Sequence, residues 1–374
     1  MGREEADLLP MEVSARVERL RPLLADVGVD ALIVTSAANV RYLTGFTGSA
    51  GLVLVTASGA LLTTDGRYRT QAREQLDDAG TSDGVELVVG GSDAQRRAIT
   101  AAVAGASATR VGLEAESITW GSQRRWAGAL GEVDTVATSG VVEGLRQVKD
   151  AGEIDRMARA ASIADRALGE VVDLLSRHRT EQEIALALDT AMRRLGADDR
   201  AFETIVAGGP NSAKPHARPS ARPVEPGDPV VIDFGATVDG YRSDMTRTFC
   251  VGGRPSTELA RLFDVVAGAQ AAGVASVRAG VSTGAIDEVC RSHIAAAGLA
   301  SAFEHGTGHG VGLDIHEAPS VSAGATAILS PGIVVTVEPG VYLAGVGGVR
   351  IEDTVVVTGD GCRSLTGFTK ESAA

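Results

Sequence analysis

The pattern of apolar and polar positions changes midway along the chain, and its first part alternates between predicted strands and helices. A helical period over 11–28 ends at Gly28, and the apolar run ALIVT (31–35) predicts a buried strand. Two apolar stretches within 51–65 meet at Ser58-Gly59 and predict a hairpin. The same alternation predicts helices at 67–78 and 93–104 and strands at 85–89 and 110–114. An α/β domain is therefore expected in this part of the chain.

From about residue 145 the pattern predicts long helices followed by strands. An alanine-rich helix is expected from Asp150 to about Leu175, and the capping box Thr180–Glu183 opens the next helix. A second helix pair is expected at about 256–278 and 282–297, before a region of apolar runs and glycine-rich turns. We therefore predict a second domain of the α+β class, closely docked on the first, with boundaries at 1–143 and 144–374.

The composition is that of an ordinary soluble protein with an acidic balance. A formal charge of −13 argues against nucleic acid and against an anionic membrane as partners. No run of about 18 apolar residues predicts a membrane span, and the acidic N-terminus has no apolar signal-peptide core. The three cysteines lack metal-ligand spacing and suit a reducing compartment. We therefore expect a cytoplasmic protein.

The stretch DFGATVDGYRSDMT (233–246) predicts a hairpin that carries two acidic residues. A turn around Val238-Asp239-Gly240 would place Asp233 opposite Asp244 on the neighbouring strand. Two like charges that face each other across a hairpin destabilise it. The pair therefore needs an explanation beyond local folding.

Histidine is scarce, yet four of the six histidines lie in two short segments of the second domain. His216 lies in a proline-rich segment, and His305, His309 and His316 lie in HGTGHGVGLDIHE (305–317). The alternate glycines oppose a helix and favour a tight approach into a strand. His305 and His309 then share one face of that strand, whereas His316 needs a bend to join them.

Two further carboxylates occur in apolar strand patterns. VVTVEPG (334–340) reaches Glu338 just before Pro339 and Gly340 end the run. GGVRIEDTVVV (347–357) carries Arg350 and Glu352 on one face of a predicted strand. An ordinary salt bridge between Arg350 and Glu352 would explain that second pair without a functional role.

Four carboxylates and an imidazole on apolar or glycine-rich segments cannot all be buried without a compensating charge. Oxygen-rich ligation with one histidine suits Mn²⁺, Co²⁺, Fe²⁺ or Zn²⁺, and about four negative ligand charges are balanced by two divalent ions. Two metals about 3.5–4 Å apart can bridge and activate a water and polarise a carbonyl. The chemistry implied is hydrolysis.

The ordered motifs DFG…SDMTRTF, HGTGHGVGLDIHE, TVEPGVY and GGVRIEDT resemble those of the pita-bread metallopeptidases, in the Xaa-Pro aminopeptidase and Xaa-Pro dipeptidase (prolidase) branch. NVRYLTGFTGS (39–49) and TTDGRYRTQA (63–72) resemble the creatinase-type N-terminal domain. The resemblance covers nearly the whole chain. It implies a catalytic domain with a curved, mostly antiparallel sheet flanked by helices.

Position by position, the resemblance assigns the metal and substrate residues. The five metal ligands it implies are Asp233, Asp244, His309, Glu338 and Glu352. Glu338 also becomes the candidate acid/base, whereas His216, His305 and His316 would bind the scissile region and stabilise the tetrahedral intermediate. Arg350 matches an arginine that supports ligands or meets a substrate carboxylate.

The implied activity is cleavage between an N-terminal residue and a following proline by a metal-bridging hydroxide. The substrates would be Xaa-Pro dipeptides or longer peptides with proline second, and the chain length favours the dipeptidase side. Two alternatives stay open: another substrate for the same metals, such as a phosphotriester, and a non-catalytic peptide- or protein-binding module. The physiological metal, with Mn²⁺ preferred, and the first residue of the substrate also stay open.

Two features stand outside these motifs. Lys214 occupies a position near His216 where the family more often has a small apolar residue, and it could meet a substrate carboxylate or lie on an exposed loop. The DGRY turn (65–68) could reach a neighbouring subunit's pocket in the homodimer that the N-terminal domain implies, or form a plain surface turn.

Overall fold

The computed structural model describes residues 8–253 and 255–371, and the chain divides into two compact units. One unit is formed by Pro10–Arg146, and the other begins at Gln147 and also contains Leu8 and Leu9. Each has a hydrophobic core of its own. Within the described ranges, no helix combines the length and the apolar character needed to cross a membrane.

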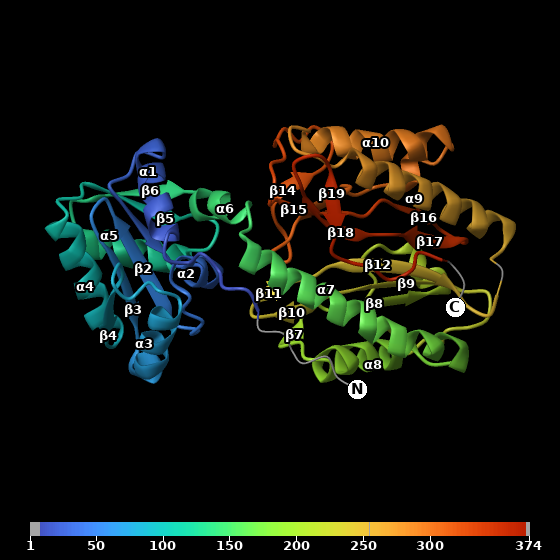
Figure 1. Cartoon of the computed structure of the whole chain (residues 1–374), viewed down its shortest axis with the longest axis horizontal. Helices are drawn as coiled ribbons and strands as arrows, with labels where there is room; N and C mark the ends of the chain where they lie inside the picture. The colour runs from blue at the N-terminus through green and yellow to red at the C-terminus, as the bar shows by residue number, and fades with distance from the viewer. Residues whose placement is uncertain (1–7, 254, 372–374) are drawn as a thin grey trace. The chain divides into compact units, whose positions relative to one another are not determined.

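The first unit is a mixed sheet with helices packed on it (Figure 1, blue to green). Its strands are β1 (Ala31–Val34), β2 (Gly51–Thr56), β3 (Ala60–Thr64), β4 (Glu86–Val89), β5 (Arg110–Glu114) and β6 (Asp134–Thr138). Its helices are α1 (Arg16–Asp26), α2 (Ala37–Thr44), α3 (Arg69–Asp78), α4 (Ser92–Gly105), α5 (Trp120–Leu130) and α6 (Val141–Arg146), with a 3-10 turn, η1 (Gly66–Tyr68). The six strands lie in the order β4-β3-β2-β1-β5-β6.

Central strand β1 explains how the sheet and the helices share a core. It pairs antiparallel with β2 and parallel with β5. Ala31 and Ile33 lie on one face of this strand and pack in a cluster with Ile99 of α4 and Trp126 of α5. The α/β class predicted for this part is confirmed. Helices α2 and α5 and strand β6 were not among the predicted elements.

The second unit combines four long helices with short antiparallel strands. The helices are α7 (Ala151–Val171), α8 (Glu181–Arg194), α9 (Thr257–Ser276) and α10 (Thr283–Ala296), and the 3-10 turns are η2 (Val172–Arg177), η3 (Gly209–Ala213) and η4 (Ala300–Ala302). The strands of its first half are β7 (Asp199–Arg200), β8 (Ile205–Gly208), β9 (Pro229–Phe234), β10 (Ala236–Val238), β11 (Tyr241–Arg242) and β12 (Met245–Cys250). The later strands are β13 (Gly308–Gly310), β14 (Glu317–Val321), β15 (Val334–Val337), β16 (Gly340–Leu343), β17 (Gly347–Arg350), β18 (Asp353–Val357) and β19 (Cys362–Ser364).

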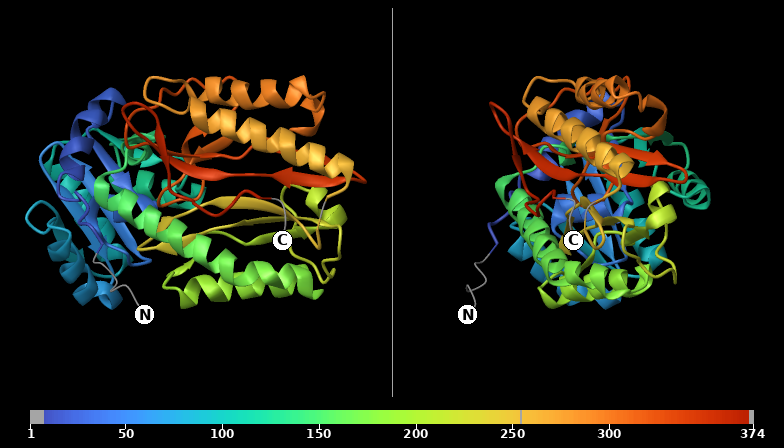
Figure 2. Two further views of the ribbon diagram at one scale, coloured as in Figure 1. Left: turned by 45° about the vertical axis from the view of Figure 1, so that its right-hand side comes forward. Right: turned by 90° about the vertical axis from the view of Figure 1, so that its right-hand side faces the viewer.

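These strands form small sheets between two helix pairs. The sheets have the orders β11-β10-β7, β12-β9-β8, β14-β13-β15-β18-β19 and β16-β17. One core cluster joins α7 and α8 to β8, β9 and β12, and another joins α9 and α10 to β15 and β18. Figure 2 shows the two helix pairs on opposite sides of the strands. The predicted antiparallel sheet flanked by helices is confirmed.

Capping residues determine where the first helix pair begins. The Asp150 side chain accepts from the backbone N–H of Glu153, and the Glu153 side chain accepts from the backbone N–H of Asp150. Thr180 and Glu183 form the same reciprocal arrangement at the start of α8, as their spacing predicts. These caps satisfy backbone donors that the first helical turn leaves without intrahelical acceptors.

The hairpin between β9 and β12 differs from the predicted register. Its tip is a two-residue turn, Asp239-Gly240, with φ of 43° and 72°. The residue opposite Asp233 is therefore Thr246, and the predicted facing of Asp233 and Asp244 is wrong by two residues. Because side chains in a strand alternate with a period of two, this shift keeps both carboxylates on the same face.

Candidate active site

A cavity of about 340 Å³ in the second unit collects the residues that the sequence predicts. Its lining includes Asp233, Asp244, His309, Glu338, Glu352, His216, His305, His316 and Arg350. The structure thus brings every predicted site residue to one place. They come from segments more than a hundred residues apart, so only the tertiary fold can assemble them.

Four of the five predicted ligands lie at strand ends and interruptions rather than in strand centres. Asp233 is near the end of β9, and Asp244 immediately precedes β12. Glu338 directly follows β15, and Glu352 lies in the break between β17 and β18. His309 is in the middle of the short strand β13. Such interruptions free a side chain from ladder packing and let it face a cavity.

The carboxylates of this cavity are held in an environment that opposes their charge. Burial, followed by repulsion from neighbouring carboxylates, raises the pKa of Asp244 and that of Glu352 well above the ordinary range. Burial raises the pKa of Glu338 to about 8, although the charge of Arg350 opposes the shift. Such a cluster must take up protons or bind cations.

Two oxygens of this cluster have no hydrogen-bond partner among the described residues, although both are buried. They are Oδ1 of Asp233 and Oε1 of Glu352. The second oxygen of Glu352 accepts a hydrogen bond of 2.7 Å from Thr246. Asp233 forms an ion pair with Arg350, so the alternative pairing of Arg350 with Glu352 is not the arrangement found. Buried oxygens without donors are what a site for a cation provides.

The orientation of His309 points to the same conclusion. Its Nδ1 lies 3.0 Å from the carbonyl of Gly310, and its Nε2 lies 3.5 Å from Asp244 and 3.4 Å from Glu338. Burial lowers the pKa of His309 to about 4, so the ring is neutral near pH 7. With Nδ1–H donated to the carbonyl, Nε2 directs a lone pair at carboxylate oxygens, and a cation between them would remove that repulsion.

The donor set therefore fits a divalent cation. One atom each of Asp244, His309 and Glu352 lies within 4.8 Å of the others, which is a spacing that one ion can bridge. Carboxylate oxygens with an imidazole nitrogen suit Mn²⁺, Zn²⁺ and related ions.

Arg350 supports this cluster from its edge. Its guanidinium donates to Asp233 at 2.5 Å, to the hydroxyl of Tyr342 at 2.6 Å and to that of Thr246 at 3.1 Å. A further bond of 3.2 Å reaches the carbonyl of Pro215. Arg350 is thus a buried support for a predicted ligand.

Tyr342 is a site residue that sequence reasoning missed. Its hydroxyl lies 3.0 Å from Nε2 of His305, whose Nδ1 lies 2.8 Å from the carbonyl of Gly306. Burial raises the pKa of Tyr342 to about 12 and lowers that of His305 to about 4. A neutral His305 therefore uses both ring nitrogens within the protein. The available signal was the position of Tyr342 in TVEPGVY, the segment that also carries Glu338.

The remaining histidines lie elsewhere on the wall of the cavity. An irregular bend over 312–316 brings the ring of His316 to 4.4 Å from that of His309, between centroids. His216 lines the cavity from the segment after η3. Lys214 does not line the cavity: its side chain is exposed, and Nζ bonds to Asn211 at 2.9 Å.

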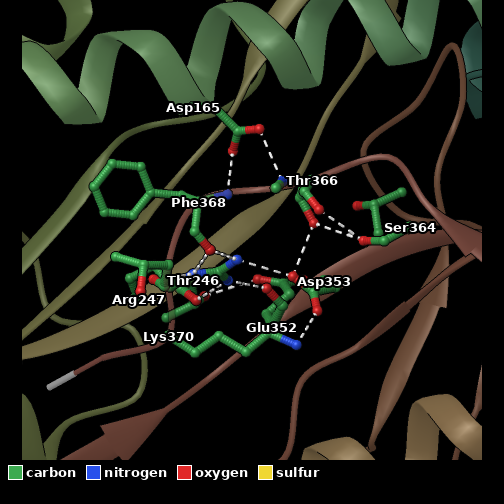
Figure 3. A network of polar contacts seen from close by, with 12 residues as sticks. Asp165, Thr246, Arg247, Glu352, Asp353, Ser364, Thr366, Phe368 and Lys370 are labelled. Atoms are coloured by element: carbon green, nitrogen blue, oxygen red, sulfur yellow. Dashed lines mark hydrogen bonds and ion pairs between the residues drawn. The ribbon is translucent and has the colours of Figure 1, made fainter.

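Behind the site, a second polar network surrounds Arg247 (Figure 3). Arg247 pairs with Asp353 at 2.9 Å and donates to the main-chain carbonyls of Thr246, Glu352, Phe368 and Thr369. Although burial opposes it, the charges of Arg247 and Lys370 hold the pKa of Asp353 below its usual range. The segment near Phe368 is also anchored by Asp165, which accepts from two backbone N–H groups.

In the first unit, the DGRY turn is exposed at Gly66 and Arg67 and partly buried at Asp65 and Tyr68. Asp65 accepts from the backbone and side chain of Arg67, and the hydroxyl of Tyr68 lies 2.7 Å from that of Ser49. This is the geometry of a capped surface turn. A role towards a neighbouring subunit stays a prediction.

Comparison with known proteins identifies the family. Residues 155–359 match the model described as metallopeptidase family M24, and residues 16–148 match the creatinase/prolidase N-terminal domain. The chain is 42% identical to an uncharacterized peptidase, YqhT, of Bacillus subtilis, over 95% of this chain and 99% of the relative.

Solved structures agree with this assignment. An Xaa-Pro dipeptidase from Bacillus anthracis superposes with a TM-score of 0.91 at 37% identity, covering 96% of this chain and 98% of that one. An X-Pro aminopeptidase from Thermotoga maritima superposes with a TM-score of 0.85 at 36% identity, covering 96% and 100%. The chain is an enzyme that belongs to metallopeptidase family M24.

Proposed function

We propose that this protein is a metal-dependent exopeptidase that cleaves the bond between an N-terminal residue and a following proline. The observation that carries the proposal is the cluster around His309, where buried carboxylate oxygens have no donor and an imidazole lone pair faces acidic oxygens. The named activities of the two solved relatives supply the substrate class.

We further propose that the site holds two divalent ions, with Mn²⁺ as the preferred metal. The residues that would hold them are Asp233, Asp244, His309, Glu338 and Glu352. Four carboxylates balance two divalent charges, whereas one ion would leave the cavity strongly anionic. Bound ions of this kind activate a water and polarise the scissile carbonyl.

The protein's own side chains then divide the remaining work. Glu338 is the candidate to hold and release a proton, because its carboxylate lines the cavity and lies 3.4 Å from Nε2 of His309. His216 and His316 are the candidates to donate hydrogen bonds to the developing oxyanion, a role in which losing one donor costs about 10²–10³ in rate. His305 is engaged by Gly306 and Tyr342, so we assign it to positioning rather than to donation.

Proline second in the substrate fits a site of this type. The tertiary amide before proline has no N–H for a protein acceptor to bind. Recognition must then come from the carbonyl and from the shape of the ring. Apolar side chains of the cavity, Phe202, Ile205 and Ile315, offer a surface for the ring.

The test is a metal-reconstituted assay with a matched peptide pair. The protein is stripped with a chelator, reloaded with Mn²⁺, and assayed on Ala-Pro-Ala and on Ala-Ala-Ala. We expect release of alanine from the first peptide alone, together with about two metal ions per chain by elemental analysis. Failure of the metal-loaded protein to cleave Ala-Pro-Ala, and also the dipeptide Ala-Pro, would overturn the proposal.

The alternatives differ in what that assay returns. A phosphotriesterase on the same scaffold would bind metal without cleaving Ala-Pro-Ala. A non-catalytic binding module would bind no metal and would show no turnover. The complete set of predicted ligands in one cavity argues against this alternative. A homodimer in the cytoplasm stays our expectation, which sedimentation and cell fractionation would test.

A further inference from the structure

The charges that line the cavity bear on the length of peptide that the site accepts. An Xaa-Pro dipeptide places a free carboxylate on its proline, next to the scissile bond, whereas a longer peptide has a neutral amide there. Proteins commonly bind such a carboxylate with an arginine fork or a lysine. A site for longer peptides needs only hydrogen-bonding groups at that point.

Among the described residues that line the cavity, Arg350 is the one with a permanent positive charge. Its side chain is 3% exposed, and its guanidinium is already bonded to Asp233, Tyr342, Thr246 and the carbonyl of Pro215. A guanidinium has five N–H groups in one plane, and these contacts use four of them. Turning it towards a substrate would leave the Asp233 carboxylate buried without its ion pair.

Other cations near the cavity are directed elsewhere. Lys214 bonds to Asn211 from an exposed loop, and a terminal nitrogen of Arg242 donates to the carbonyl of Ala201, although Nε of Arg242 has no partner among the described residues. Neither residue lines the cavity. The described residues therefore provide no uncommitted fixed charge in the cavity for a substrate carboxylate.

The uncharged groups of the lining suit an amide instead. Ser320 and Ser322 both line the cavity, and their hydroxyl oxygens lie 2.8 Å apart. Each hydroxyl can donate to a carbonyl or accept from an N–H. A peptide bond after proline offers its own carbonyl and N–H, and such groups are satisfied by neutral partners.

We propose that the site discriminates against a free carboxylate on proline and prefers peptides that continue beyond it, as an aminopeptidase does. The inference rests on the proposed Xaa-Pro activity and reverses the expectation drawn from chain length. The residue that determines it is Arg350, which is committed to Asp233.

The experiment compares Ala-Pro, Ala-Pro-amide and Ala-Pro-Ala with the Mn²⁺-loaded protein at pH 8, where free imidazoles are uncharged. Ala-Pro and its amide have nearly the same size and differ in charge. We expect kcat/KM for the amide and for the tripeptide to exceed that for Ala-Pro roughly 10- to 100-fold, the range of a charge-assisted hydrogen bond.

The outcomes separate this inference from the proposed function. Equal or faster cleavage of Ala-Pro would overturn the inference and leave the proposed function standing. An amide that is cleaved as poorly as Ala-Pro, with only the tripeptide cleaved well, would overturn the role of charge. If none of the three peptides is cleaved, both proposals fail.

A paired substitution tests the same point from the side of the protein. Ser320 is exposed and lines the cavity, so it can carry a longer side chain. Ser320→Lys introduces a free cation, and Ser320→Met introduces similar bulk without charge. Both variants lose the serine hydroxyl and only one gains a charge, so we expect the ratio of Ala-Pro to Ala-Pro-amide cleavage to be about tenfold higher in the Lys variant than in the Met variant. A ratio that responds equally to both would contradict the inference.

Discussion

Two buried arginines of the second unit, Arg247 and Arg350, form networks of the same chemistry with different degrees of completion. Arg247 binds Asp353 and several carbonyls. Among the described residues, neither Arg247 nor Asp353 has a buried polar side-chain atom without a partner. Arg350 binds Asp233, yet one oxygen of Asp233 has no partner. In the first network, which we call the closed network, the protein supplies a partner for every buried polar atom of the pair. In the second, which we call the open network, the oxygen of Asp233 needs a further partner, and a bound cation would provide it.

The difference shows why buried charge alone does not identify a functional site. Thr246 and Arg247 are neighbours on β12, and period-two alternation directs them to opposite faces of the strand. Thr246 bonds to Glu352 on the cavity side, and Arg247 bonds to the carbonyl of the same Glu352 from behind. Strand β12 thus contributes to the candidate site with one face and to a structural network with the other.

The largest expected effect comes from breaking the closed network. Arg247→Met removes the buried partner of Asp353, leaves that carboxylate with only the partly exposed Lys370 as a counter-charge, and deprives main-chain carbonyls of their donor, which costs about 3–5 kcal/mol of stability. Urea unfolding, followed by circular dichroism, measures the loss. The control is Arg261→Met, on an exposed helix face. A change in the free energy of unfolding below about 1 kcal/mol would mean that the Arg247 network contributes little to stability.

The open network should respond in the opposite way. Asp244→Ala relieves repulsion among buried carboxylates, so we expect the metal-free protein to unfold at the same or a higher urea concentration. Removing a ligand should nevertheless lower metal content and reduce kcat/KM by more than about 100-fold, beyond the losses typical of residues that only support ligands. Elemental analysis and the Ala-Pro-Ala assay check both effects. Wild-type metal content in this variant would contradict the dinuclear assignment.

The hairpin shows how far the sequence could predict the site. Asp233 and Asp244, which the sequence predicts as metal ligands, both line the cavity although the predicted register is wrong by two, because an even shift preserves the face of a strand. The exact register depended on positive φ at Asp239, and the Asp-Gly pair there was the local signal for a two-residue turn.

The unpredicted parts depend on partners that sequence patterns do not reveal. Tyr342 is an ordinary strand former, and only its tertiary contacts with Arg350 and His305 identify its role. Arg247 binds main-chain carbonyls more than a hundred residues away, and every residue type has such a carbonyl. The sequence therefore allowed prediction of the charged residues within motifs. It did not allow prediction of neutral supporting side chains such as Tyr342, or of the main-chain carbonyls that bind Arg247.

A smaller effect is expected at the hydroxyl that joins Arg350 to His305. Tyr342→Phe keeps the ring and removes that hydroxyl, so Arg350 and His305 each lose one bond. We expect kcat to fall about 10-fold, with metal content unchanged, as for a residue that orients others. The split between kcat and KM is informative, because loss of positioning lowers kcat, whereas loss of substrate contact raises KM. A variant with reduced metal content would place Tyr342 in direct support of the ligands.

The smallest effect tests whether the closed network survives without its outer member. Lys370 pairs with Asp353 but is 40% exposed, and Arg247, Gln270 and Thr366 remain bonded to that carboxylate without it. Lys370→Met should therefore cost less than about 1 kcal/mol, because solvent screens an exposed pair. The matched control is Lys214→Met, which lies outside the network. A loss as large as that of Arg247→Met would show that the network closes only when Lys370 is present, so its stability would depend on a residue that solvent can reach.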